Sequence, residues 1–212
     1  MRFELPTPGT LTPNDAVDPL PYYYHPWVGW LYRHRLQMGL DLLPVGGRCV
    51  LEIGVGSGVL VPTLTKHYTE YTGTDLTLAR GLDALVAAGC RATFRRADLL
   101  RDGDLPADRY DAIVCFSVLE HIADAAGAAR TLAGALAPGG TLVAGYPMVS
   151  PLMCRAFAAL GFAHIDDHHV SPPVRIAAAL GAVLTPVERV AFPPGAPVGL
   201  ALYQCSAWTK TA

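Results

Sequence analysis

The sequence predicts an α/β fold in which helices cover both faces of a mostly parallel sheet and the last strand is antiparallel. Three observations lead to this prediction. Short apolar runs alternate with helical patterns from residue 49 onward, and the first of them enters the glycine turn Gly54-Val55-Gly56-Ser57-Gly58. A proline- and glycine-rich link at 193–197 joins the last two apolar runs. Alternation at this spacing favours parallel strands joined by right-handed crossovers.

The N-terminal segment precedes this alternation. Residues 1–26 contain six prolines, and such a density predicts an extended arm or a lid without a helix. The aromatic stretch from Tyr22 to Trp27 has two interpretations: a staple that holds the first helix to the sheet, or a lid with an aromatic wall. Residues 27–43 have the apolar spacing of a helix.

The remaining elements follow from the spacing of apolar residues and from the turn signals between them. Strands are predicted near 49–53, 70–74, 92–95, 111–116, 140–145, 183–191 and 200–208. Helices are predicted near 58–67, 77–88, 124–136, 151–160 and 172–181. The link at 193–197 predicts an antiparallel hairpin. We expect a single domain over 1–212, with 1–43 as arm, helix and lid, and 44–212 as the core.

The glycine turn after the first strand indicates a nucleoside ligand, because glycines let the backbone approach a ligand where any Cβ would collide. Asp75 follows about 20 residues later, at the end of the second strand, which is the usual place for an acid that binds a ribose diol. A second interpretation of Asp75 is a helix cap, since Thr77 and a helical run follow it.

The spacing of the glycines helps to separate two classes of ligand. A dinucleotide site has the pattern G-x-G-x-x-G, whereas the glycines here are residues 54, 56 and 58 and an acid, Glu52, precedes them. A carboxylate would repel a pyrophosphate and attract a ligand with a cationic amino acid end. A nicotinamide cofactor and a turn without a ligand remain alternatives.

Four segments together resemble the class I S-adenosylmethionine-dependent methyltransferases, in their small-molecule branch. They are Glu52 to Gly58, Ala97-Asp98-Leu99, Tyr110 to Ile122, and Leu136 to Val143. The resemblance implies a Rossmann-like, seven-stranded fold with an antiparallel last strand at the sheet edge. It also implies S-adenosyl-L-methionine as the cofactor. It implies that Asp98 binds the adenine amino group, although loop aspartates often cap turns. The cofactor contacts that it implies are Glu52, Gly54, Gly56, Gly58, Asp75, Leu76, Asp98, Leu99 and Phe116.

Three histidines are candidates for a catalytic base. His121 follows the fourth strand, where a capping or packing role is equally open. His168 and His169 belong to a cluster with His164, Asp166 and Asp167. Adjacent residues point apart, so we predict no metal there; a base near the substrate, a helix cap and a solvated loop are the alternatives.

Composition narrows the possible partners. The chain has a formal charge of −2 and scattered basic residues, so we expect no nucleic-acid partner. No apolar run approaches the ~18 residues of a membrane span. The five cysteines lie far apart with no C-x-x-C, which predicts reduced thiols and a cytoplasmic protein. Nothing in the sequence indicates the oligomeric state.

The sequence therefore predicts a methyltransferase that moves a methyl group from S-adenosylmethionine to an oxygen, nitrogen or carbon atom of a small molecule, for example in natural-product biosynthesis. Two other hypotheses stay open. A similar protein could bind the cofactor and catalyse a cyclisation or rearrangement without methyl transfer, or it could act as a binding module without enzymatic activity.

Overall fold

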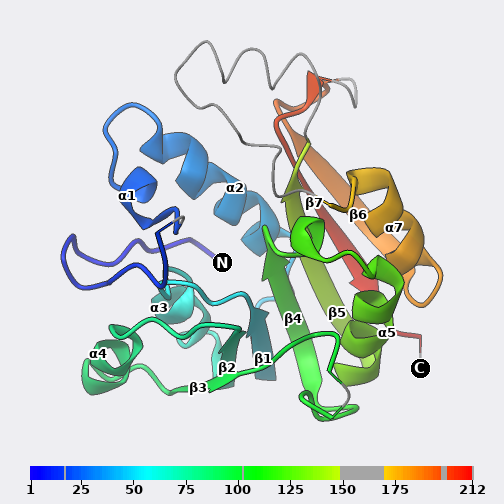
Figure 1. The fold of residues 1–212 in the computed structure, drawn as a ribbon, viewed down its shortest axis with the longest axis horizontal. Helices are drawn as coiled ribbons and strands as arrows, with labels where there is room; N and C mark the ends of the chain where they lie inside the picture. The colour runs from blue at the N-terminus through cyan, green and yellow to red at the C-terminus, as the bar shows by residue number, and fades with distance from the viewer. Residues whose placement is uncertain (17, 102, 149–169, 197–199, 212) are drawn as a thin grey trace.

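The computed structural model describes residues 1–16, 18–101, 103–148, 170–196 and 200–211. Seven strands form one sheet: β1 (Gly47–Ile53), β2 (Tyr68–Asp75), β3 (Ala92–Arg96), β4 (Tyr110–Phe116), β5 (Leu136–Pro147), β6 (Thr185–Phe192) and β7 (Tyr203–Thr209). Their order across the sheet is β3-β2-β1-β4-β5-β7-β6 (Figure 1). The predicted α/β class and the seven-stranded sheet are confirmed.

Strand direction also agrees with the prediction, but the place of the last strand does not. Strands β1 to β5 pair in parallel, and β7 runs antiparallel to both β5 and β6. The expectation that the last strand forms the edge was wrong, because β7 lies between β5 and β6. Residues 203–208 of β7 are all buried, whereas 185–189 of β6 are exposed. The buried strand therefore takes the interior position and the exposed strand takes the edge.

Helices cover both faces of the sheet. The helices α2 (Gly29–Asp41), α3 (Val61–Leu64) and α4 (Leu82–Ala87) lie on one face, and α5 (Ala125–Ala135) and α7 (Pro173–Gly181) lie on the other (Figure 1). Successive side chains of β1 point to opposite faces of the sheet. Leu51 and Ile53 pack in the cluster that includes α5 and α7, while Val50 packs in the cluster that includes α2, α3 and α4. Two apolar cores thus hold the sheet from both sides.

The arm and two predicted helices differ from expectation. The prolines of the arm do not prevent a helix, because Leu20–Tyr23 form a short one, α1. Pro21 lies in its first turn, where a missing N–H removes no helical hydrogen bond. The helix predicted from 58 begins only at Val61, after the left-handed Gly58. The helix predicted over 77–88 is shortened to α4, and the helix predicted over 151–160 lies outside the described residues.

The strand order creates the place for a site. From β1 the chain moves outward to β2 and β3, and from β4 it moves outward in the other direction to β5. The connection that follows β1 and the connection that follows β4 therefore run in opposite directions across the sheet. A crevice opens between them, beyond the carboxyl ends of these two strands. The glycine turn leaves β1 at this edge, and a short 3-10 helix, η1 (Leu119–His121), follows β4.

Candidate functional site

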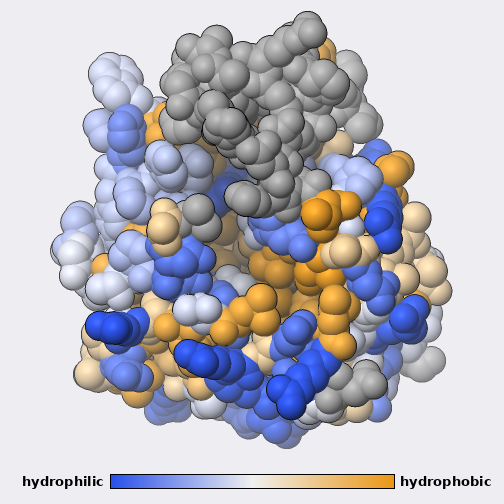
Figure 2. Space-filling view, in the orientation of Figure 1, coloured by the Kyte–Doolittle hydropathy of each residue, from blue (hydrophilic) through white to orange (hydrophobic). Residues whose placement is uncertain are grey.

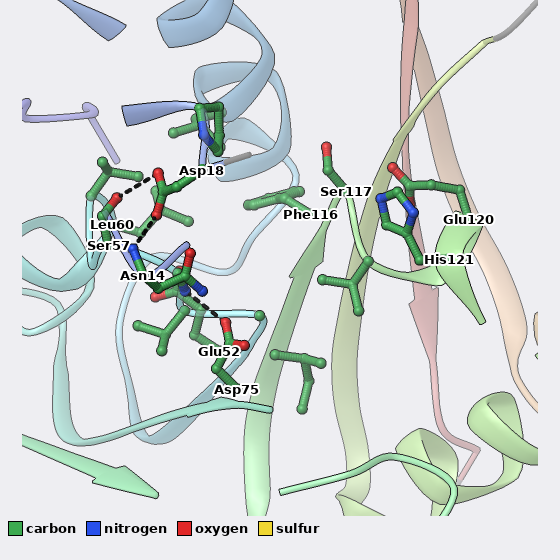
Figure 3. A pocket seen from close by; sticks show the side chains of 18 of the residues that line it. Asn14, Asp18, Glu52, Ser57, Leu60, Asp75, Phe116, Ser117, Glu120 and His121 are labelled. Atoms are coloured by element: carbon green, nitrogen blue, oxygen red, sulfur yellow. Dashed lines mark hydrogen bonds between the residues drawn. The ribbon is translucent and has the colours of Figure 1, made fainter. Parts of the chain in front are cut away.

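A cavity of about 1080 Å³ lies at this edge of the sheet. Figure 2 shows a hollow near the middle of the corresponding face, with apolar surface beside it. The sequence-predicted residues in the cavity wall are Glu52, Gly54, Gly56, Asp75, Leu76, Asp98, Leu99, Phe116 and His121. Figure 3 shows polar side chains on two sides of the cavity, with Phe116 between them. Asp18, Glu52 and Asp75 lie on one side, and Ser117, Glu120 and His121 lie on the other.

The three glycines of the turn have different roles, although all are in the left-handed region that favours glycine. A Cβ on Gly58 would lie 2.8 Å from side-chain atoms of Leu82 and Leu85, so this glycine allows α4 to pack closely. Gly58 is absent from the cavity wall, unlike the other two. A Cβ on Gly54 would collide with Val118. At Gly56 the nearest atom would be Asp18 Oδ2 at 3.6 Å, so a ligand has room to approach its backbone.

Asp75 at the end of β2 holds the glycine turn. The Gly56 N–H donates to its Oδ2 at 2.9 Å, and the Thr77 N–H donates to its Oδ1 at 3.2 Å. The Thr77 hydrogen bond closes a turn and caps no helix, because α4 begins only at Leu82 with Gly81 as its N-cap, so the helix-cap interpretation was wrong. A carboxylate has about four acceptor positions, so these two hydrogen bonds leave capacity for a ligand hydroxyl. Ribose binding by Asp75 remains a prediction.

Glu52 is the most deeply buried acid at this end of the cavity, with 4% of its surface exposed. The Tyr71 hydroxyl donates to its Oε2 at 2.5 Å. The pKa of Glu52 is raised to about 8, mainly by burial and to a smaller extent by the nearby Asp75, while the Tyr71 hydrogen bond lowers it. The half-buried Asp75, and Glu52 once it ionises, attract a cation and repel a phosphate.

The wall beyond β3 is formed by Asp98 and two leucines. The Leu100 N–H donates to Asp98 Oδ1 at 2.9 Å, so Asp98 caps a turn. Asp98 is exposed, Leu99 is buried, and Leu76 is exposed at the cavity rim. In this arrangement the two leucines can pack against the flat face of an adenine ring while Asp98 accepts a hydrogen bond from the edge of the ring. The adenine role of Asp98 stays a prediction.

Sequence analysis missed Asp18, which connects the arm to the glycine turn. Asp18 is 8% exposed. Its Oδ1 accepts from the Leu20 N–H at 2.8 Å and from the Ser57 hydroxyl at 3.2 Å, and its Oδ2 accepts from the Asn14 N–H at 3.0 Å (Figure 3). The arm therefore lies across the turn. The only sequence signal was an acid next to Pro19, which by itself indicates a turn.

The opposite end of the cavity is built around the end of β4. A Cβ on Gly39 of α2 or on Gly145 of β5 would collide with the Phe116 ring, so these glycines make room for it. Ser117 has φ +56°, its N–H donates to the Gly145 carbonyl at 2.7 Å, and its hydroxyl lies 3.1 Å from the Tyr203 hydroxyl. Left-handed backbone at a non-glycine residue is strained, and such strain often marks a functional site.

Arg35 and Glu120 bring charge to this end, and sequence analysis assigned a role to neither. Arg35 donates to the Tyr23 hydroxyl at 3.0 Å, and its guanidinium carbon lies 4.5 Å from the centroid of the Tyr32 ring and 5.7 Å from that of Tyr203. Its Nε is buried, and no group of the described residues forms a hydrogen bond with it. Glu120 is 2% exposed, and burial raises its pKa to about 7 although Arg35 lowers it.

Of the three histidines, only His121 can be placed, in the cavity wall on η1. His168 and His169 lie outside the described residues, as do His164, Asp166 and Asp167. Within the described ranges, no three His, Cys, Asp or Glu side chains are arranged to hold a metal ion. The same ranges contain no helix with the length and apolarity that membrane crossing requires.

Comparisons with known proteins agree with this geometry. Residues 31–182 match the family described as "Methyltransferase domain". An uncharacterized methyltransferase of Mycobacterium tuberculosis is 32% identical over 107 residues, which are 48% of this chain and 51% of that protein. A ubiquinone biosynthesis O-methyltransferase of Alkalilimnicola ehrlichii is 32% identical over 106 residues, 46% of this chain and 40% of that protein. The chain thus spans about half the length of the curated relatives it matches.

Solved structures show the same fold. The N-methyltransferase NodS from Bradyrhizobium japonicum, in complex with S-adenosyl-L-homocysteine, is 22% identical with a TM-score of 0.67, covering 94% of this chain and 95% of that one. The [4+2]-cyclase SpnF is 14% identical with a TM-score of 0.67, covering 89% and 84%. The family match covers well over half of the chain. The chain therefore belongs to the class I S-adenosylmethionine-dependent methyltransferase family.

Proposed function

We propose that this protein transfers a methyl group from S-adenosylmethionine to a small molecule. The observation that carries the proposal is the open approach to the Gly56 backbone beside three acids, Asp18, Glu52 and Asp75. These residues fit the cofactor, because it combines a ribose diol with a cationic amino acid end. The bound cofactor supplies a methyl group already activated on a sulfonium.

The protein's own part in such a reaction is to hold two partners in line. Orientation of this kind is worth ~7–11 kcal/mol. We propose that residues 1–43 act as a lid over a core of 44–212, all within one domain, because Asp18 joins the arm to Ser57 and both Tyr22 and Tyr23 line the cavity. A hydroxyl acceptor also needs a base. The histidines that sequence analysis put forward for this step, His121, His168 and His169, remain hypotheses.

Chemistry without methyl transfer is the second candidate function. It is supported by the likeness in fold to SpnF, which is named as a [4+2]-cyclase. Methyl-labelled S-adenosylmethionine distinguishes the two functions. A methyltransferase moves the label into product, whereas a cyclase of this fold leaves it on the cofactor.

We expect S-adenosylhomocysteine to bind the purified protein in calorimetry and NAD not to bind. Acids beside the glycine turn favour a cationic ligand over a pyrophosphate. Binding of NAD without binding of S-adenosylhomocysteine would contradict the proposed function.

An Asp75→Ala substitution should weaken S-adenosylhomocysteine binding by about 1–3 kcal/mol, because ligand hydroxyls would lose a buried acceptor. Asp124→Ala is a matched control, since Asp124 accepts from the Gly127 N–H at 2.9 Å as the cap of α5 and is not part of the cavity wall. Each variant removes a carboxylate that accepts a hydrogen bond from a backbone N–H, so both should lose some stability. Equal dissociation constants for Asp75→Ala and wild type in calorimetry would refute the ribose role.

We propose small molecules, rather than nucleic acids, as acceptors, because the cavity is enclosed by aromatic and apolar residues and the chain has a formal charge of −2. We also propose the cytoplasm as its location. Cys49, Cys90, Cys115 and Cys205 are free thiols, which are typical of reducing compartments.

A further inference from the structure

Glu120 is a buried carboxylate that the fold itself does not use. Its backbone carbonyl accepts from the N–H groups of Val170 and Ser171, at 2.8 and 3.0 Å, which fixes η1 in place. Both side-chain oxygens are buried, and within the described residues no other residue donates a hydrogen bond to either of them; the backbone N–H of Glu120 itself lowers the pKa of the carboxyl group. Buried polar groups are almost always paired, and each exception calls for an explanation. Glu120 lines the cavity, on the same side as Ser117 and His121 (Figure 3).

The surroundings of Glu120 combine a fixed cation with aromatic hydroxyls. Arg35 lowers the pKa of Glu120, and Glu120 in turn raises the pKa of Tyr203 and of Cys115. The elements around η1 carry these further ionisable groups toward this end of the sheet: His121 of η1, Tyr146 of β5 and the exposed Arg175 of α7. Arg35 is thus the charged group that affects the pKa of Glu120, and no described residue forms an ion pair with Glu120.

We propose that the methyl acceptor is an acidic hydroxyl, phenolic or enolic, and that the Glu120 carboxylate takes its proton as the oxygen is methylated. The inference rests on the proposed methyl transfer. The hydroxyl O–H bond breaks and its proton goes to Glu120. A new O–CH₃ bond forms as the S–CH₃ bond breaks, and the sulfur keeps the electron pair of that bond. One cationic sulfonium and one carboxylate become a neutral thioether and a carboxylic acid.

The charge of Arg35 separates hydroxyl from amine acceptors. An oxygen that loses its proton develops negative charge, which a nearby guanidinium stabilises. A protonated amine would be repelled by the same cation. The flat rings of Tyr22, Tyr23 and Tyr32 in the cavity wall suit an aromatic or conjugated acceptor. Glu120 therefore takes the role that sequence analysis assigned to a histidine.

The first test needs no acceptor. Without partners, an ionised Glu120 destabilises the folded protein, so Glu120→Gln should raise the melting temperature at pH 8.5 by roughly 2–4 °C. The wild-type carboxyl is protonated in both states below its ordinary pKa, so the two proteins should melt alike near pH 4. A melting temperature that falls at pH 8.5 would show that the carboxylate is a structural group and would overturn the proposal.

The second test uses methyl-labelled S-adenosylmethionine with p-cresol and catechol as hydroxyl probes, and benzylamine and phenethylamine as amine probes. We expect label in the phenols alone. At pH 7, Glu120→Gln should lower turnover of the methylated phenol by a factor of roughly 10²–10⁴, with less loss at high pH, where the phenol ionises unaided. Its affinity for S-adenosylhomocysteine in calorimetry should match that of wild type. Glu70→Gln is the matched control, because Glu70 lies on β2 with about half of its side chain exposed.

Three results would overturn this inference. They are label in the amines alone, no label in any probe by a protein that binds S-adenosylhomocysteine, and Glu120→Gln turnover within threefold of wild type. The proposed function fails on different grounds, namely absence of S-adenosylhomocysteine binding. A loss confined to His121→Asn, with Glu120→Gln unaffected, would return the base to the histidine.

Discussion

Gly56→Val is expected to reduce S-adenosylhomocysteine affinity by at least about 100-fold, or 2.7 kcal/mol. A Cβ at this position meets no protein atom closer than 3.6 Å, so a branched side chain would extend into the space that the ligand needs. Left-handed backbone costs a non-glycine residue roughly 1–2 kcal/mol, which the fold should tolerate. Calorimetry measures the affinity, and circular dichroism checks that the variant is folded.

Gly89→Val separates the loss of ligand space from the cost of backbone strain. Gly89 has φ +98°, a Cβ there has no neighbour within 4 Å, and the residue lies outside the cavity wall. The same substitution thus introduces comparable strain without approaching a ligand. If both variants bind the cofactor as wild type does, the Gly56 backbone is not its contact surface.

Glu52→Gln should stabilise the protein without ligand at pH 8.5 by an amount on the order of a few kcal/mol. The folded-state pKa of Glu52, about 8, lies above its ordinary value of 4.5. Between these values the folded protein holds a proton that the unfolded chain releases, so wild-type stability falls as pH rises through this window. A glutamine side chain cannot ionise, and its amide oxygen can still accept from the Tyr71 hydroxyl. Urea unfolding at pH 4.5 and 8.5 measures the change.

The same variant should bind S-adenosylhomocysteine roughly tenfold more weakly, because the cationic amino end of the ligand would lose a carboxylate. In wild type that affinity should increase from pH 6 to 8.5 as Glu52 ionises. Glu188→Gln, on the exposed edge strand β6, should alter neither stability nor affinity. An affinity that is independent of pH in wild type would remove Glu52 from the cofactor site.

Much of the cofactor end could be predicted from sequence because its residues follow consecutive strands. In a parallel sheet the carboxyl ends of β1, β2, β3 and β4 meet at one edge, so local motifs become spatial neighbours. Gly54, Gly56, Asp75 and Asp98 were predicted in this way, and all four line the cavity, while their contacts with the cofactor stay predictions. Gly58 was not distinguished from the other two glycines, because its close contact with α4 is visible only in three dimensions.

Arg35 and Tyr203, at the opposite end of the cavity, were missed for the opposite reason. Arg35, Ser117 and Tyr203 come from three distant parts of the chain, and no local spacing relates them. Sequence analysis put forward His121 as a base, since imidazole titrates near neutral pH, and gave Glu120 no role. The burial that moves the pKa of a carboxyl group toward that range depends on tertiary packing.

The insertion of β7 between β5 and β6 has a consequence for the order of folding. Because β7 is antiparallel, its first residue, Tyr203, lies at the edge where the parallel strands end, beside Ser117. Pairing β7 with β5 closes a long loop, and non-local pairing of this kind forms slowly. The ribosome synthesises the chain from its N-terminus. The glycine turn and strands β1 to β4 all precede residue 122, so they can fold while β7 is still being synthesised. Tyr203, which completes the opposite end of the cavity beside Ser117, would thus join the fold only after the residues around the glycine turn are in place.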